Sequence, residues 1–199
     1  MSDAREPRAS KPSQQPFPSS PQRQFAVLAG GCFWCTQAAF QNVPGVLRVV
    51  AGYTGGSAET ATYEAVCRKD TGHAEAVCIE FDPQRITFQR LLELFFELHD
   101  PTQYHRQGAD VGPQYRSAIF YATPEQRQQA TEVIERLTAE KKFPAPIVTT
   151  LEPLESFYPA EQYHQDFARR HPDHPYVRAV IRPKLEKLQH LLTRARPPI

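Results

Sequence analysis

The alternation of hydrophobic and polar residues divides the chain into short strands and amphipathic helices. The apolar run 25–29 predicts a buried strand, and the β-branched run 46–53 predicts another. Residues 73–82 alternate with a period of two, which is typical of a strand with two distinct faces. Glu75 shares one of these faces with three large apolar residues, Val77, Ile79 and Phe81.

Helical periodicity follows in several places. Thr87 can cap a helix that runs to about residue 98, with its apolar positions on one side. The run Thr123-Pro124-Glu125-Gln126 predicts a capping box that starts a helix to about residue 142. Weaker helical patterns cover 160–169 and 183–194, and strands are predicted over 117–122 and 147–154. The polar stretch 99–116 is longer than a plain connection, which favours a functional loop.

The mixed order of strands and helices predicts an α/β or α+β sandwich with two layers around one sheet. Residues 1–24 contain five prolines and five serines, with Phe17 and Met1 as the large apolar residues. Such a segment buries too little surface to offset the entropy of ordering it, so we expect a disordered tail. Residues 25–199 are long enough for a single catalytic domain with a substantial core.

The charge balance excludes several function classes. With 23 basic and 22 acidic residues, the formal net charge is +1, and nothing in it calls for nucleic acid or an anionic membrane as partner. No apolar segment resembles a signal peptide or a membrane span. We therefore expect a soluble, cytoplasmic protein.

Two cysteines, Cys32 and Cys35, carry the clearest chemical signal. The glycine pair before Cys32 turns the chain out of the first strand, and residues 32–42 have helix-like composition. Cys32 is then expected at a helix N-terminus, where free N–H groups and the helix dipole favour an ionised, reactive thiolate. Cys35 lies one turn along, within disulfide reach. This pattern favours redox chemistry at sulfur.

Other interpretations of the cysteine pair remain open on the residues alone. A structural zinc site needs two more ligands, but Cys67 and Cys78 do not have paired spacing, and the scattered histidines His73, His99, His105 and His164 do not supply it. A thioredoxin-like dithiol exchanger also fits. The aromatic residues between the cysteines, Phe33 and Trp34, are typical either of core packing or of walls around a small apolar group. We expect Cys67 and Cys78 to be packing cysteines, and His73 and His164 to make structural hydrogen bonds.

Glu75 is the second informative residue. An unpaired carboxyl that points into an apolar core has a raised pKa and keeps its proton near neutral pH. The alternatives are a strand-end carboxylate in solvent or one paired with an arginine. A reactive thiol elsewhere in the chain makes an acid catalyst the more interesting interpretation.

Seven sequence blocks over about residues 25–167 resemble, in their order, those of the peptide methionine sulfoxide reductase A family. They are Gly31-Cys32-Phe33-Trp34, Gly52-Tyr53-Thr54-Gly55-Gly56, Thr71-Gly72-His73-Ala74-Glu75, His99-Asp100-Pro101-Thr102, Arg106-Gln107-Gly108, Gln114-Tyr115-Arg116-Ser117 and Tyr163-His164-Gln165. The resemblance implies an α+β two-layer sandwich, ferredoxin-like around a mixed sheet with long coil segments. It also implies reduction of one epimer of methionine sulfoxide.

The resemblance assigns roles to individual residues. It implies that the Cys32 thiolate attacks the sulfoxide sulfur while Glu75 supplies the proton to its oxygen. Tyr63 and Tyr115 match the tyrosines that hydrogen-bond this oxygen, and Asp110 matches the aspartate that supports substrate and site. Phe33 and Trp34 are implied to enclose the S-methyl group. Methionine leaves, and Cys32 remains as a sulfenic acid.

The sequence departs from the family pattern at three positions. Many members have glycine where this chain has Cys35, and they keep resolving cysteines in a C-terminal tail, whereas here no cysteine follows Cys78. Cys35 resembles the resolving cysteine of the subgroup with the Gly-Cys-Phe-Trp-Cys motif. His105 stands where asparagine is usual, and Phe167 where a tyrosine is common, which removes one hydroxyl near the oxygen.

The resemblance therefore implies a peptide-methionine (S)-S-oxide reductase that acts on free and protein-bound substrate. A Cys32–Cys35 disulfide forms and thioredoxin reduces it. We expect a monomer that requires no organic cofactor and no metal. The rival hypotheses are a general thiol–disulfide oxidoreductase, in which Glu75 has no clear task, and a zinc-stabilised binding domain.

Overall fold

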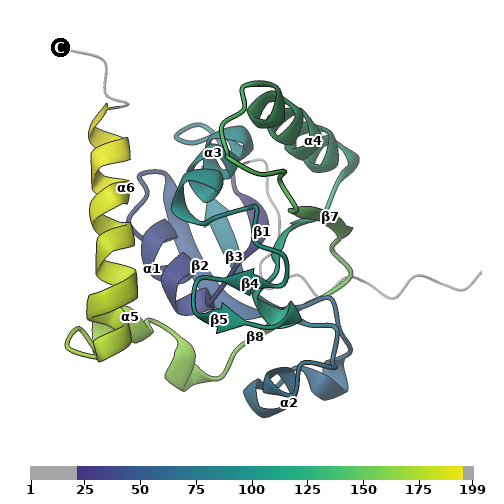
Figure 1. Cartoon of the computed structure of the whole chain (residues 1–199), viewed down its shortest axis with the longest axis vertical. Helices are drawn as coiled ribbons and strands as arrows, with labels where there is room; N and C mark the ends of the chain where they lie inside the picture. The colour runs from purple at the N-terminus through teal and green to yellow at the C-terminus, as the bar shows by residue number, and fades with distance from the viewer. Residues whose placement is uncertain (1–21, 195–199) are drawn as a thin grey trace, which may run out of the picture.

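The structure is a computed structural model, and it describes residues 22–194. A six-stranded mixed sheet forms its centre, with the strand order β7-β6-β1-β3-β2-β8 (Figure 1). Neighbouring strands are antiparallel except for β6 and β7, which are parallel. The strands are β1 (Gln24–Gly30), β2 (Val46–Thr54), β3 (Ala74–Phe81), β6 (Ser117–Tyr121), β7 (Thr150–Pro153) and β8 (Phe157–Pro159).

Helices cover one face of the sheet and enclose the main core. Large apolar residues of the central strands, such as Leu28, Ile79 and Ile119, pack there against buried residues of the helices. Burial of both faces makes β3 inaccessible along its whole length. The main helices are α1 (Phe33–Phe40), α3 (Phe88–Leu98), α4 (Pro124–Ala139) and α6 (Arg182–Arg194).

The opposite face of the sheet holds a second and smaller core cluster, in which Ala29 and Ala118 lie with Phe25, Phe120 and Phe157. Short elements and coil complete the chain. They include α2 (Tyr63–Cys67), α5 (Phe167–Arg170), the π-helical turn Val177–Ile181, and the hairpin of β4 (Arg106–Gln107) and β5 (Asp110–Val111). This arrangement confirms the predicted α+β fold, with two layers around a mixed sheet and long coil segments.

The predicted caps are confirmed. The hydroxyl oxygen of Thr87 accepts a hydrogen bond from the amide of Arg90 at 3.1 Å and begins α3. The hydroxyl of Thr123 accepts from the amide of Gln126 at 3.2 Å and begins α4. The second half of the capping box is not formed, because the Gln126 amide group reaches back to Ala122 and to Phe25 on the neighbouring β1.

Some predicted boundaries differ from the structure. The helix predicted over 160–169 is broken into a 3₁₀ turn, Gln162–His164, and the four-residue α5. The stretch 99–116 is not a plain loop, since it contains the β4–β5 hairpin and a second 3₁₀ turn, Pro113–Tyr115. Tertiary contacts decide both segments, and short polar segments carry no period that would show this.

A disordered tail is predicted over residues 1–24, and residues 1–21 of it lie outside the part of the chain that the structure describes. Of its last three residues, Gln24 already belongs to β1 and pairs with Phe81. No helix within residues 22–194 combines the length and the apolar character that crossing a membrane needs.

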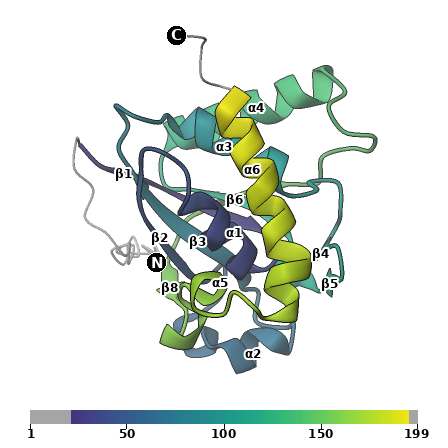
Figure 2. The same cartoon turned by 90° about the vertical axis from the view of Figure 1, so that its left-hand side faces the viewer.

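The C-terminal helix α6 runs across the outer side of α1, so that α1 lies between α6 and the sheet (Figure 2). The same view shows α5 close to the start of α6. The first turn of α1 is thereby brought next to residues near the end of the chain, more than a hundred positions later.

Candidate active site

Cys32 lies where the central strand β1 turns into α1. Gly31 makes the turn with a φ of 92°, a conformation that favours glycine, and a Cβ there would lie 2.6 Å from the side chain of Gln107. Cys32 is the N-cap residue of α1, and its carbonyl accepts from the amide of Cys35 at 3.1 Å. Its side chain is half-buried, so the sulfur lies at the edge of the core.

Glu75 lies on β3, directly below this helix end, and is 2% exposed. Its Oε2 accepts a hydrogen bond from the amide of Phe33 at 3.0 Å. Burial raises the pKa of the Glu75 carboxyl to about 8, although the hydrogen bond from Phe33 opposes the shift. At neutral pH the carboxyl therefore holds its proton, as the strand pattern predicted.

The pKa of Cys32 differs from the expectation for a thiol at a helix N-terminus. It is raised well above its ordinary value by the hydrogen bond to Cys35, by burial and by the charge of Glu75. The first free amide of the helix, that of Phe33, bonds to Glu75 and is not among the groups that lower the pKa of Cys32. The prediction of an easily ionised Cys32 was therefore wrong for the resting protein.

Of the two thiols, Cys35 is the one that ionises more easily. Its pKa is lowered to about 7, first by the hydrogen bond from Cys32 and further by Lys184 and Tyr176. Near pH 7 about half of the molecules therefore carry a thiolate at Cys35, and the hydrogen bond between the two thiols shares the remaining proton. Both are free thiols, and Cys35 is 3% exposed.

Tyr176 connects Cys35 to the β4–β5 hairpin. Its hydroxyl donates to Oδ2 of Asp110 at 2.7 Å and lies 3.6 Å from the sulfur of Cys35. Tyr176 could not be predicted as a site residue, because no local pattern marks it and it lies 141 positions from Cys35. The structure thus brings Asp110, a predicted site residue, to the cysteine pair through a residue that was not predicted.

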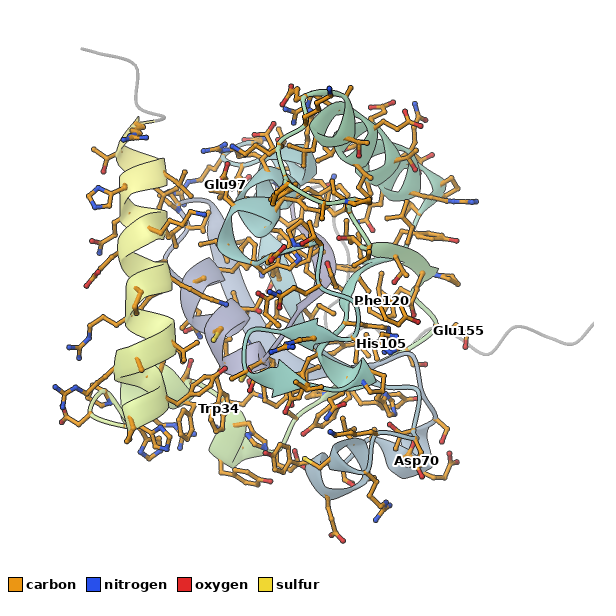
Figure 3. The ribbon with its side chains drawn as sticks, viewed as in Figure 1. Trp34, Asp70, Glu97, His105, Phe120 and Glu155 are labelled. Carbon is orange, nitrogen blue, oxygen red and sulfur yellow. The ribbon has the colours of Figure 1, made fainter. Side chains whose placement is uncertain are left out.

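The aromatic residues between the cysteines have different surroundings. Trp34 is half-buried in the first turn of α1, on the side where its ring meets Phe167 of α5 (Figure 3). Its Nε1 donates to Nδ1 of His164 at 3.1 Å, and its ring stacks on Phe167 with centroids 3.6 Å apart. Phe33 is 1% exposed and packs against Tyr53 and His164. Phe33 therefore lies beneath the site, and Trp34 lies at its edge.

The two predicted tyrosines are half-buried on separate elements, Tyr63 at the start of α2 and Tyr115 after the β4–β5 hairpin. Burial raises the pKa of both phenols, and the charges of Glu75 and Cys32 add to it. Both hydroxyls therefore keep their protons and remain donors. Glu161, which was not predicted, accepts from the amide of Tyr63 at 2.8 Å and fixes the start of α2.

The histidines make structural contacts. His73 accepts from the amide of Gly56 at 3.2 Å through Nδ1, and its Nε2 then donates to the carbonyl of Ser57 at 2.8 Å. His164 holds Trp34, as described above. The predicted structural roles of His73 and His164 are confirmed. Within residues 22–194, no group of three or more His, Cys, Asp or Glu side chains is placed to hold a metal ion.

The remaining cysteines differ from each other. Cys78 is fully buried in β3, and burial raises its pKa to about 12, which confirms a packing cysteine. Cys67 was also expected to be buried, but this was wrong. It is exposed at the end of α2, where its thiol is in hydrogen-bond contact with the hydroxyl of Tyr63.

A thiol pair that shares a proton, beside a protonated carboxyl on a two-layer α+β fold, defines a cysteine-dependent oxidoreductase. Residues 24–196 match the family model described as peptide methionine sulfoxide reductase. The chain therefore belongs to the peptide methionine sulfoxide reductase family.

Individual relatives agree. The chain is 52% identical to the peptide methionine sulfoxide reductase MsrA of Deinococcus radiodurans, over 89% of this chain and 85% of the relative. It is 54% identical to the MsrA of Thermus thermophilus, over 82% of this chain and 92% of that relative.

Solved structures share the fold. Reduced Mxr1 from Saccharomyces cerevisiae is 31% identical, with a TM-score of 0.73 over 77% of this chain and 89% of that one. Methionine sulfoxide reductase A of Corynebacterium diphtheriae is 34% identical, with a TM-score of 0.69 over 84% and 86%.

Proposed function

We propose that this protein reduces the S epimer of methionine sulfoxide, free or in proteins, with Cys32 as the nucleophile. The observation that carries the proposal is the position of Glu75, a buried and protonated carboxyl bonded to the residue that follows Cys32. A sulfoxide sulfur is a poor electrophile until its oxygen is protonated or strongly hydrogen-bonded. A proton donor beside a thiolate meets this requirement.

In the first step the Cys32 sulfur attacks the sulfoxide sulfur. The proton of the Cys32 thiol passes to the Cys35 thiolate through their hydrogen bond, since the pair holds one proton. Glu75 donates its proton to the oxygen as the sulfur–oxygen bond of the substrate breaks. The oxygen passes from the substrate sulfur to the Cys32 sulfur as the transient bond between the two sulfurs breaks, which leaves Cys32 as a sulfenic acid and releases methionine. The substrate sulfur gains the two electrons that Cys32 loses.

The surrounding side chains position the substrate in this proposal. The hydroxyls of Tyr63 and Tyr115 donate to the sulfoxide oxygen, since both phenols keep their protons. The indole of Trp34, held by His164 and stacked on Phe167, forms the wall for the S-methyl group, with Phe33 beneath it. Asp110 supports the site through the hydroxyl of Tyr176 rather than from the bottom of a pocket.

In the second step Cys35 attacks the sulfenic acid of Cys32, and a Cys32–Cys35 disulfide forms with the loss of water. Thioredoxin then reduces this disulfide. In yeast, Mxr1 has been solved in complex with Trx2, and that structure shares this fold with a TM-score of 0.54 at 23% identity. A disulfide that a dithiol must reduce in every cycle requires a reducing compartment, which favours the cytoplasm.

The test is the intact mass of the pure protein after addition of each epimer of methionine sulfoxide. The S epimer should remove two hydrogens, mapped to Cys32 and Cys35, and release methionine, while the R epimer should leave the protein unchanged. Cys32→Ser should release no methionine, with Cys78→Ser as the control for a cysteine away from the site. Equal reaction with both epimers would instead favour a general disulfide exchanger, and methionine release by Cys32→Ser would contradict the proposal.

A further inference from the structure

The C-terminal segment of the described chain carries no cysteine, yet it covers the resolving cysteine. Val177 and Ile181 are buried against Cys35 and Ala38 of α1. α6 continues this contact along the outer side of α1 (Figure 2). The environment of Cys35 is therefore set by this segment and not by α1 alone.

Lys184 lies in the first turn of α6, half-buried on the side that meets α1. It lines a small cavity of about 10 Å³ together with Cys35 and His99. Within residues 22–194 no carboxylate forms an ion pair with Lys184. One turn later, Lys187 pairs with Glu97 at 3.5 Å, at the end of α3 (Figure 3). The two lysines of one helix thus face different partners.

Most other titratable groups that face Cys35 are uncharged at neutral pH. Glu75 on β3 is protonated, burial lowers the pKa of His99 to about 4, and burial keeps the phenol of Tyr176 protonated. The carboxylate of Asp110 opposes a negative sulfur, but it accepts the hydroxyl of Tyr176. Lys184 supplies a positive charge that favours a thiolate at Cys35.

We propose that Lys184 is a positioning residue for the second step, in which its ammonium group stabilises the Cys35 thiolate that attacks the oxidised Cys32. This rests on the relay proposed above. The Cys35 sulfur forms the disulfide bond to the Cys32 sulfur, whose bond to oxygen breaks. The oxygen leaves as hydroxide and becomes water with the proton that Cys35 gave up, so that Cys35 is oxidised and the sulfenic sulfur is reduced.

The test uses a single turnover of the full chain with the S epimer in the absence of any dithiol. Methionine release and disulfide formation are timed separately by rapid quenching, with trapping of the sulfenic acid by dimedone. Lys184→Met should still release about one methionine per enzyme but should accumulate more sulfenic acid. Loss of the positive charge should raise the pKa of Cys35, so that less of it is thiolate at low pH, although each thiolate is then a better nucleophile. Disulfide formation should therefore be about threefold slower near pH 6 and no slower near pH 9, where Cys35 is ionised in both proteins.

A loss of packing would not produce this crossing of the two pH profiles. Lys184→Arg keeps the charge and should restore the profile of the unmodified protein. Lys187→Met removes a charge from the same helix away from Cys35 and should leave the profile unchanged. Equal rates for Lys184→Met and the unmodified protein at every pH, or an equal loss at every pH, would overturn the inference.

A second readout does not depend on turnover. In the Cys32→Ser background, the rate at which iodoacetamide alkylates Cys35, mapped by peptide mass, reports its ionisation directly. Adding Lys184→Met should move the midpoint of this rate to higher pH. An unmoved midpoint would overturn the inference about Lys184 and would not bear on the proposed function. If the unmodified protein released no methionine, the proposed function itself would fail.

Discussion

At the scale of single residues, the site is governed by where protons rest. The amide of Phe33 is the group that would stabilise an anion at the start of α1, and it bonds to Glu75 at 3.0 Å. The carboxyl, rather than Cys32, therefore receives the benefit of the helix N-terminus. Burial outweighs this benefit and raises the pKa of Glu75 to about 8. The result is a proton held beside the sulfur that we propose as the nucleophile.

Replacement of Glu75 by glutamine tests this arrangement. The amide of the new side chain is not a proton donor of comparable strength, although its oxygen can still accept from the backbone amide of Phe33. We expect Glu75→Gln to slow methionine release in a single turnover by about a hundredfold to ten-thousandfold, the usual contribution of a general acid. Glu80→Gln on the same strand is the matched control and should react at the normal rate. A normal rate for Glu75→Gln would remove the acid from the mechanism.

The same carboxyl makes stability depend on pH. The pKa of Glu75 rises from an ordinary 4.5 to about 8, so between these pH values the folded state binds a proton that the unfolded state has lost. The contribution of Glu75 to the free energy of unfolding should therefore be largest below pH 4.5. It should fall by about 1.4 kcal/mol per pH unit until the pH passes 8.

Urea unfolding of the unmodified protein and Glu75→Gln at several pH values isolates this contribution, because all other groups are shared. The free energy of unfolding of Glu75→Gln relative to the unmodified protein should increase with pH over this range. A constant difference between the two proteins would show that Glu75 is not protonated in the folded state.

At the scale of elements, one amide side chain joins α1, β2 and the turn before α5. Oε1 of Gln165 accepts from the amide of Ala51 at 3.0 Å and from Nε2 of Gln37 at 2.9 Å. Its Nε2 donates to the carbonyl of Ala51 at 2.8 Å and to that of Ala160 at 3.0 Å. Gln37, on α1, is itself 2% exposed, whereas Gln165 is half-buried, so only the inner side of this network is shielded from water. The neighbouring His164 holds Trp34, which makes the network a support of the site.

Loss of this amide should cost stability, because buried partners then remain unpaired. We expect Gln165→Ala to lower the free energy of unfolding by about 2 kcal/mol or more. Gln162→Ala, an exposed position in the same segment, should change it little. Denaturant unfolding measures both variants, and equal stability of the two would contradict a structural role for the network.

At the scale of the whole molecule, the catalytic cycle depends on two halves of the fold that meet at α1. The sheet supplies Glu75, and the C-terminal segment supplies Tyr176 and Lys184 to Cys35. In the proposed mechanism the first half supplies the proton donor for the attack on the sulfoxide. The second half governs Cys35, which accepts the proton of Cys32 during that attack and afterwards resolves the oxidised sulfur. The two steps can therefore be separated by substitution.

Cys35→Ser should separate them. Because Cys32 remains, this variant should release about one methionine per enzyme. It should then stall with thioredoxin, since no internal disulfide can form. A chemical dithiol that attacks the sulfenic acid directly should restore some turnover. Thioredoxin-driven turnover of Cys35→Ser at the normal rate would contradict the relay, with Cys78→Ser as the control.

Several parts of the fold and site could be predicted from the sequence because short-range rules determine them. The period-two pattern of residues 74–81 correctly placed Glu75 on the core side of its strand. Threonine caps correctly marked the starts of α3 and α4. The β4–β5 hairpin and the break before α5 could not be predicted in this way, because short polar segments adopt whichever conformation their tertiary contacts stabilise.

The sequence by itself determined the cysteine spacing, the strand–turn–helix that presents Cys32, and the burial of Glu75, since each follows from residues close along the chain. Only the tertiary structure decided which sulfur carries the charge and how Trp34 is held. Glu75 helps to raise the pKa of Cys32, and His164 fixes the ring of Trp34 through a hydrogen bond. Tyr176 and Lys184 determine the environment of Cys35. Residues that meet in the site are far apart along the chain. Phe33 and Glu75 are 42 positions apart and Cys35 and Tyr176 are 141 positions apart, and no local period in the sequence encodes contacts over such separations.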